Sequence, residues 1–212
     1  WVHAASMGEA IAATTLSREL LRVHPEARLH LTASTRSGRE RLAVVEPHAS
    51  LAPIDTPQAV HRFVKGVQPE RIMLLETELW PHWLLRAAAD GIPVAVVSAR
   101  LSERSARRYQ RLGPELRQIV HGLAAVLCQS EEDEQRWLSI GAAPERTRVV
   151  GNLKSDGLPE PVVDRAAARG ALGLLADRPL LVLGNVRPGE GRPARKSTRL
   201  NSSHANISYA VF

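Results

Sequence analysis

Three carboxylates in two short polar segments are the side chains best suited to acid–base chemistry in this sequence. Glu9 ends the segment Ser6-Met7-Gly8-Glu9, and Glu76 and Glu78 flank a threonine. A carboxylate can take a proton from an attacking hydroxyl, and Gly8 would let the backbone approach a ligand closely. Glu9 could equally be a helix-start residue that complements the helix dipole, so this segment alone leaves both interpretations open.

The segment 32–38 is rich in hydroxyl groups and small residues, which are suited to lining a sugar or phosphate pocket. Its candidate binding residues are Thr35, Arg36 and Gly38. The same composition is typical of a plain strand-to-helix connection with a capping residue. Both interpretations stay open here too.

Two basic residues complete the set of candidates. Arg100 could pair with Glu76 or Glu78, or it could bind an anionic substrate through two parallel hydrogen bonds. Lys154 ends the segment Gly151-Asn152-Leu153-Lys154. It could reach into a cleft between domains or lie on the surface as a solvated lysine.

The histidines favour neither a metal centre nor a hydrolase triad. The eight histidines are scattered, and no pair has the spacing of zinc ligands. The chain also has no Gly-x-Ser-x-Gly segment and no phosphate-binding P-loop. We therefore predict no metal and no cofactor.

Strand and helix patterns alternate along the chain and place each polar segment directly after a strand. Apolar runs predict six strands before residue 151, at 1–5, 28–33, 71–75, 93–97, 123–128 and 146–150. Helical spacing predicts helices at 9–23, 57–67, 80–90, 103–121 (broken at Gly113-Pro114) and 130–140. This alternation predicts an α/β fold, a Rossmann-like parallel sheet with flanking helices. Such sheets bind ligands at the carboxyl ends of their strands, where the polar segments lie.

The chain is predicted to contain one domain and the start of another. Residues 1–156 form the Rossmann-like domain, and residues 157–178, with Pro159 and Pro161, form an interdomain linker. Residues 179–190 begin a second domain with a strand. The serine-rich stretch 191–212 has no clear period and is predicted to be a non-native or disordered tail. Because the sequence begins at Trp1 inside an apolar run, we expect it to be part of a longer protein.

Charge and composition exclude several classes of function. The net charge is +6, but the stretch 191–212 supplies much of it, with four basic residues and no acidic one. A nucleic-acid site needs its basic residues clustered on a folded face, so we predict no nucleic-acid partner. The single cysteine, Cys128, excludes an intrachain disulfide. No apolar run approaches the roughly 18 residues of a membrane-spanning helix.

Taken in order, the polar segments resemble the motifs of the 3-deoxy-D-manno-octulosonic acid (Kdo) transferases of lipopolysaccharide synthesis. Those motifs are Ser-x-Gly-Glu, a Thr-x-Thr-x-x-Gly-like loop, Glu-Thr-Glu-Leu-Trp-Pro, Asn-Ala-Arg-Leu-Ser and Gly-Ser/Asn-Leu-Lys. The matching segments begin at residues 6, 32, 76, 98 and 151. Residues 184–190 resemble the Gly-Ser-Thr-x-x-Gly-Glu loop that opens the donor domain. Ser98 and His82 stand where the family usually has asparagine.

The resemblance implies the N-terminal lobe of a GT-B glycosyltransferase that is inverting and metal-independent. It implies transfer of Kdo from CMP-Kdo to lipid IVA at the cytoplasmic face of the bacterial inner membrane. Glu9 matches the family's general base. The residues implied to bind the acceptor are Ser6, Gly8, Thr35, Arg36, Gly38, Glu76, Glu78, Arg100 and Lys154, and those implied to bind the donor are Arg187 and Glu190.

Two alternatives stay open at this point. The chain could be a lobe of another GT-B transferase or of a nucleotide-sugar epimerase. It could also be a truncated domain that binds acceptor without turnover, because a bilobal enzyme needs both lobes to close around its substrates.

Overall fold

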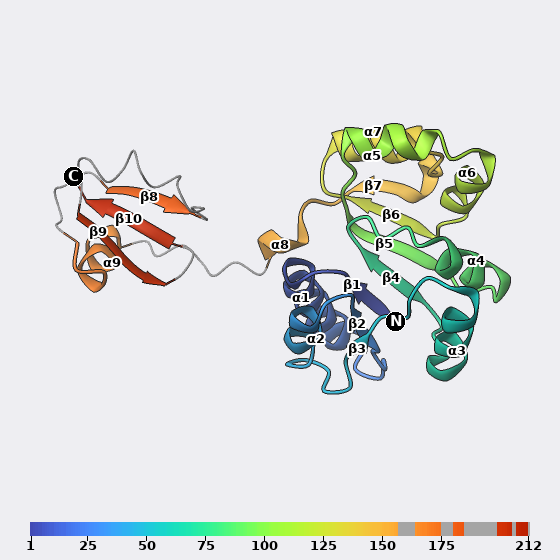
Figure 1. Ribbon diagram of the computed structural model, residues 1–212, viewed down its shortest axis with the longest axis horizontal. Coiled ribbons are helices and arrows are strands. Elements are labelled where there is room, and N and C mark those ends of the chain that lie inside the picture. The colour runs from blue at the N-terminus through green and yellow to red at the C-terminus, as the bar shows by residue number, and fades with distance from the viewer. Residues whose placement is uncertain (157–163, 175–179, 185–198, 205–206, 212) are drawn as a thin grey trace. The chain divides into compact units, whose positions relative to one another are not determined.

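A seven-stranded parallel sheet organises the first part of the computed structural model (Figure 1). Its strands lie in the order β3-β2-β1-β4-β5-β6-β7. They are β1 (Val2–Ala4), β2 (Leu31–Ala33), β3 (Ser50–Leu51), β4 (Ile72–Leu75), β5 (Val94–Ala99), β6 (Ala125–Cys128) and β7 (Thr147–Val149). The prediction of a Rossmann-like parallel sheet is confirmed. The predicted number of strands was one too low, because β3 has only two residues and shows no alternation of apolar and polar side chains.

The chain divides into two compact units, Trp1–Leu158 and Pro159–Phe212, and each is described by itself. The structure describes residues 1–156, 164–174, 180–184, 199–204 and 207–211.

Helices connect the strands of the first unit. They are α1 (Met7–Val23), α2 (Arg36–Leu42), α3 (Pro57–Val67), α4 (Pro81–Ala89), α5 (Glu103–Gln110), α6 (Pro114–His121), α7 (Glu131–Ser139) and α8 (Leu153–Asp156). The predicted break at Gly113-Pro114 is confirmed, because this pair separates α5 from α6 and Gly113 has φ 85°. Ser130 caps α7 as predicted, by accepting a hydrogen bond from the backbone N–H of Asp133.

The core lies on both faces of the sheet, as a buried parallel sheet requires. Successive strand residues point to opposite faces, and Leu74 and Leu75 accordingly belong to two different apolar clusters. One cluster contains Val60 of α3 and Trp83 of α4. The other contains small residues of α1, including Ala10 and Ala13, which let that helix pack close to the sheet.

The order of the strands fixes where a ligand would bind. The chain runs outward from β1 to β2 and β3, then returns to place β4 on the other side of β1. The crevice at such a reversal, at the carboxyl ends of the two strands, is where ligands bind in open α/β sheets. Residues that follow β1 and β4 therefore meet at this switch point.

The second unit contains helix α9 (Arg165–Ala171) and a three-stranded sheet of order β8-β10-β9. Strand β8 (Leu180–Gly184) agrees with the strand predicted from residue 179 onward. It pairs antiparallel with β10 (Ile207–Val211), which also pairs antiparallel with β9 (Arg199–His204). The sequence predicted no strands in 191–212, because the alternation of Ile207, Tyr209 and Val211 with smaller residues is short and isolated. The domain limits given above stay a prediction.

Within the described ranges, no helix combines the length and the apolar character needed to cross a membrane.

Candidate active site at the carboxyl ends of β1 and β4

Glu9 closes a capping box at the start of α1. Ser6 is the N-cap, and its Oγ accepts a hydrogen bond from the Glu9 N–H at 3.4 Å. The Glu9 carboxylate returns to the turn, where Oε2 accepts from the Ala5 N–H at 2.6 Å and Oε1 from the Ser6 hydroxyl at 3.0 Å. In a Ser-x-x-Glu capping box the glutamate returns to the N–H of the N-cap residue. Here it accepts one residue earlier, from Ala5, and from the Ser6 hydroxyl. The carboxylate is thereby held in one orientation.

The surroundings of Glu9 raise the pKa of its carboxyl above the ordinary value. Burial is the largest cause, since the residue is only 9% exposed. The hydrogen bonds from Ala5 and Ser6 act in the opposite direction, and the negative charges of Glu76 and Glu78 raise the pKa further. A carboxylate whose pKa is moved toward neutrality is better matched to accepting a proton at physiological pH.

Glu76 follows β4 directly and adopts left-handed backbone with φ 59°. Its N–H still donates to the Val97 carbonyl of β5 at 3.1 Å, so the turn begins at the last hydrogen bond between β4 and β5. Its side chain forms an ion pair with Lys154 from α8. A Cβ atom at Gly8 would lie 3.9 Å from the Lys154 Nζ, so the ammonium also lies beside the opening turn of α1. The structure thus brings together Ser6, Gly8, Glu9, Glu76 and Lys154.

Glu78 contacts the end of a buried hydrogen-bonded chain. Its Oε2 lies 3.7 Å from Nε2 of His3, whose side chain is completely buried. Behind the ring, His3 Nδ1 lies 2.9 Å from the Thr32 hydroxyl, which also accepts from the Trp1 indole N–H at 2.7 Å. Glu78 Oε2 also accepts from the Trp80 indole N–H at 2.6 Å. Two neighbours therefore hold this carboxylate.

The 32–38 segment caps α2 and packs against the opening turn of α1. Thr35 is the N-cap, and its Oγ1 accepts from the Gly38 N–H at 3.1 Å. A Cβ at Gly38 would lie 3.0 Å from the Ala33 Cβ and 3.5 Å from the Ser6 carbonyl carbon, so glycine allows this close approach. Arg36 is exposed at the first helical position.

Arg100 does not pair with Glu76 or Glu78, which corrects one of the two roles considered for it. Lys154 pairs with Glu76, and His3 and Trp80 contact Glu78. The backbone carbonyl of Arg100 accepts a hydrogen bond from the Thr77 hydroxyl. Its guanidinium is exposed and has no hydrogen bond or ion pair with the described residues.

Ser98 is a second left-handed residue at this edge of the sheet, with φ 52°. Its Oγ lies 3.2 Å from Gln129 Nε2 and accepts from the Leu153 N–H at 3.3 Å. Ser98 therefore fixes the segment that carries Lys154.

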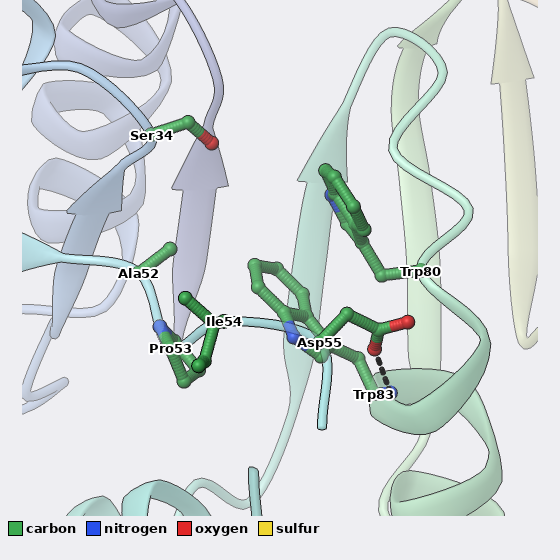
Figure 2. A pocket seen from close by; sticks show the side chains of 7 residues that line it. All are labelled: Ser34, Ala52, Pro53, Ile54, Asp55, Trp80 and Trp83. Carbon is green, nitrogen blue, oxygen red and sulfur yellow. Dashed lines mark hydrogen bonds between the residues drawn. The ribbon is translucent and has the colours of Figure 1, made fainter. Parts of the chain in front are cut away.

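A pocket of about 300 Å³ (Figure 2) lies next to Glu78, because its lining residue Trp80 donates its indole N–H to that carboxylate. Trp80 and Trp83 form one wall and residues 52–55 the other, with Ser34 at the rim. Asp55 fixes the two walls together, because its Oδ1 accepts from the backbone N–H groups of His82 and Trp83 at 3.0 and 3.3 Å. Asp55 thereby caps α4, whose nominal cap, Trp80, has no capping side-chain bond.

Sequence reasoning assigned no role in this site to His3, Asp55 or Trp83, and it noted Ser98 only as the first residue of the segment that carries Arg100. His3, Trp83 and Ser98 are buried, and their sequence pattern is that of core residues. Asp55 acts on a helix that begins 26 residues later, and no local pattern signals such a cap. Arg187 and Glu190 lie outside the described residues. No group of three or more potential metal ligands occurs in the part of the chain that the structure describes.

The sequence matches a known family over most of this unit. The model of the 3-deoxy-D-manno-octulosonic-acid transferase (kdotransferase) family matches residues 1–157. A 3-deoxy-D-manno-octulosonic acid transferase of Bordetella pertussis is 40% identical over 198 residues, which cover 90% of this chain and 45% of that protein. The corresponding Haemophilus influenzae protein is 31% identical over 202 residues, which cover 94% of this chain and 47% of the relative. The chain thus spans about half the length of these curated relatives.

Solved structures share the fold at low sequence identity. A UDP-N-acetylglucosamine 2-epimerase from Rickettsia bellii superimposes with a TM-score of 0.53 at 15% identity, over 82% of this chain and 50% of the epimerase. The Neisseria meningitidis enzyme, solved with UDP-GlcNAc, gives 0.51 at 17% identity over 74% of this chain and 46% of that one. At such identities the likeness concerns the fold alone. The family match and the carboxylates gathered at the switch point lead to one conclusion: the chain belongs to the 3-deoxy-D-manno-octulosonic-acid (Kdo) transferase family.

Proposed function

We propose that the protein to which this chain belongs is a glycosyltransferase of lipopolysaccharide synthesis that moves Kdo from CMP-Kdo to lipid IVA. The observation that carries the proposal is the family match over residues 1–157, in which three carboxylates face the switch point of the sheet. Relatives that match this chain are named 3-deoxy-D-manno-octulosonic acid transferases. In this proposal, the present lobe binds the acceptor.

Glu9 is the proposed general base. Each of its carboxylate oxygens accepts one hydrogen bond within the turn, and a carboxylate oxygen has a second lone pair for a substrate hydroxyl. As the acceptor oxygen attacks the anomeric carbon, its proton passes to Glu9 and the bond from that carbon to CMP breaks on the opposite face. The configuration at the anomeric carbon inverts, and no metal is needed for this step.

The proposed acceptor-binding residues surround Glu9 in two groups. Ser6, Gly8, Glu76, Glu78 and Lys154 line the switch point. Thr35, Arg36, Gly38 and Arg100 lie on neighbouring segments, where the exposed guanidinium groups suit the phosphates of a lipid acceptor. Arg187 and Glu190 are proposed to contact the donor. An acceptor of this kind would place the enzyme at the cytoplasmic face of the inner membrane.

A substitution at Glu9 tests the proposal in a complete homologue that carries this lobe. Glu9→Gln keeps the capping geometry, because glutamine also serves in a capping box, but it removes the base. We expect transfer from CMP-Kdo to fall by about 10²–10⁴-fold, the usual contribution of a general base. Glu19→Gln, on the exposed side of α1, is the matched control and should leave the rate unchanged. Wild-type activity in Glu9→Gln would refute the role of Glu9.

A further inference from the structure

The pocket beside the carboxylates has features that the proton-transfer step does not use. Its wall consists of two indole rings, Trp80 and Trp83, whose centroids lie 5.9 Å apart. Trp80 is 39% exposed, although it lines the pocket and donates its N–H to Glu78. The ring therefore presents part of its surface to solvent.

A buried donor without an acceptor is the second feature. The indole N–H of Trp83 is buried and has no hydrogen-bond partner among the described residues. A buried donor that lacks a partner costs about 1–3 kcal/mol. Figure 2 shows the Trp83 ring at the wall of the pocket, with Ile54 and Asp55 on the side of its nitrogen. Ile54 is 72% exposed, and both Ile54 and Trp83 line the pocket.

We propose that this pocket is a subsite for one neutral pyranose ring of the acceptor, with Trp80 as the stacking surface and Trp83 as a hydrogen-bond donor. The C–H groups of a sugar carry partial positive charge and suit the negative face of an indole ring. The sugar's hydroxyl groups match Ser34 at the rim and the free N–H of Trp83. The volume of about 300 Å³ is at the lower end for small-molecule sites and suits a single ring.

The polar lining favours a sugar over the other two parts of a lipid-linked acceptor. A phosphate would lie near Asp55 in the pocket and Glu78 beside it, and like charges repel. An acyl chain would cover the exposed Ser34 hydroxyl, which contacts His3 Nε2 at 3.5 Å, and the Trp83 N–H, which has no partner among the described residues. It would hydrogen-bond neither group, and such desolvation is unfavourable. A pyranose ring satisfies both groups and brings no charge.

This inference rests on the proposed function, because it names the part of the acceptor that the lobe holds beside Glu9. The Ser34 N–H donates to the Ala5 carbonyl at 3.2 Å, and the Ala5 N–H donates to Glu9. The rim of the pocket is therefore joined by backbone hydrogen bonds to the turn that orients the base. A ring in the pocket would place its neighbouring hydroxyl groups at the switch point.

Nuclear magnetic resonance of the indole groups tests the subsite without any assay of activity. The chain has four tryptophans, so four indole N–H signals can be assigned by single Trp→Phe variants. Methyl β-D-glucopyranoside is the probe, and sodium octanoate and inorganic phosphate are the rival ligands. We expect the glycoside to move the Trp80 and Trp83 signals with a saturating curve. The Trp83 signal should move downfield, because its N–H gains an acceptor.

Trp137 serves as the internal control. Its buried N–H also has no partner within the described part of the chain, but the residue lies on α7 and does not line the pocket. Ala52→Leu, which fills the pocket, should weaken glycoside binding at least about tenfold, whereas Ala88→Leu on the exposed side of α4 should not. Loss of the Trp137 signal in Ala52→Leu would show that this variant does not fold. Ile54→Trp is then used as the blocking variant instead of Ala52→Leu.

Three outcomes would overturn the subsite: octanoate or phosphate alone moves the Trp80 and Trp83 signals, no probe moves them, or the blocking variants bind the glycoside as the wild type does. The glycoside could fail to bind in this pocket while Glu9→Gln still loses most of its transfer activity. That combination would refute the subsite and leave the proposed function intact.

Discussion

His3 Nε2 faces Glu78 Oε2 at 3.7 Å, and the hydrogen bonds behind the ring determine which ring nitrogen of neutral His3 carries the hydrogen. Trp1 Nε1 can only donate, so Thr32 Oγ1 accepts from it at 2.7 Å. Among the described residues, the acceptor within reach of the Thr32 hydroxyl hydrogen is His3 Nδ1 at 2.9 Å. In the neutral ring, Nδ1 therefore accepts and Nε2 carries the hydrogen, with Ser34 Oγ at 3.5 Å and Glu78 Oε2 at 3.7 Å from that nitrogen.

Replacing Thr32 should alter this tautomer. Thr32→Val leaves both the Trp1 N–H and His3 Nδ1 without a partner, which should destabilise the fold by about 1–3 kcal/mol. It should also raise the population of the Nδ1–H tautomer. Thr32→Ser keeps the hydroxyl and is the matched control. Nitrogen chemical shifts of His3 measure the tautomer and urea unfolding measures the stability. An unchanged tautomer in Thr32→Val would disprove the assignment.

The capping box predicts different effects for two substitutions of Glu9. Glu9→Ala removes the acceptor of the Ala5 N–H, and we expect the free energy of unfolding to fall by about 1 kcal/mol. Glu9→Gln keeps an acceptor at that position and should retain the stability. Thermal and urea unfolding of the two variants measure the difference, and equal stabilities would show that the box contributes nothing to folding.

Stability should depend on pH through Glu9. Its pKa is raised in the folded chain, mainly by burial, above the ordinary value of 4.5. Between 4.5 and the higher folded pKa, the native state binds more protons than the unfolded state, so stability falls as pH rises. Glu9→Gln should lose this slope, whereas the exposed control Glu19→Gln should keep it. Urea midpoints measured from pH 4 to pH 8 test the expectation, which parallel curves for wild type and Glu9→Gln would contradict.

Gly38 and Gly66 should respond in opposite ways to alanine. A Cβ at Gly38 would meet Ala33 Cβ and Thr35 Oγ1 at 3.0 Å, whereas nothing lies within 4 Å of a Cβ at Gly66. Gly66→Ala should stabilise α3 by about 0.5–1 kcal/mol. Gly38→Ala should destabilise by about 1–3 kcal/mol, because the buried Ala33 must shift. Chemical denaturation measures both changes, and a stabilising Gly38→Ala would show that the turn has room.

Asp55 should stabilise α4, although it lies far from that helix in the sequence. Asp55→Ala removes the acceptor of the His82 and Trp83 N–H groups and should cost about 0.5–2 kcal/mol. Asp55→Asn keeps an oxygen there and should cost less. Asp90→Ala removes an ion pair with Arg86 at the other end of α4 and should leave the first turn of that helix unchanged. Hydrogen exchange of the first turn of α4 provides a local measurement, and protection unchanged in Asp55→Ala would argue against the cap.

Local patterns were sufficient to predict most of this fold. The spacing of Val60 and Val64 predicted a helix at 57–67, which matches α3 (Pro57–Val67), and compact apolar runs located every strand of the first sheet except β3. The edge position and two-residue length of β3 leave almost no signal in sequence. Ser6, Gly8, Glu9, Glu76 and Lys154 meet because they follow parallel strands or lie beside them.

Partners far apart in the chain could not be predicted in the same way. The preference of Glu76 for Lys154 over Arg100 depends on the path of the chain after β7, where Ser98 fixes the Leu153 backbone. The contact between His3 and Glu78 depends on the order of β1 and β4 in the sheet. Both contacts are set by the tertiary structure, and the spacing of residues in the sequence does not predict them.

Glu76 and Ser98 hold left-handed backbone at the ends of adjacent strands, with φ 59° and 52°. For residues other than glycine, such a conformation costs on the order of 1–3 kcal/mol. In a library randomised at these two codons and sorted only for folded protein, glycine and asparagine should therefore be enriched. Sorted for sugar transfer, the same library should return glutamate at position 76. The difference between the two pools would show where selection for activity has opposed selection for stability in this lobe.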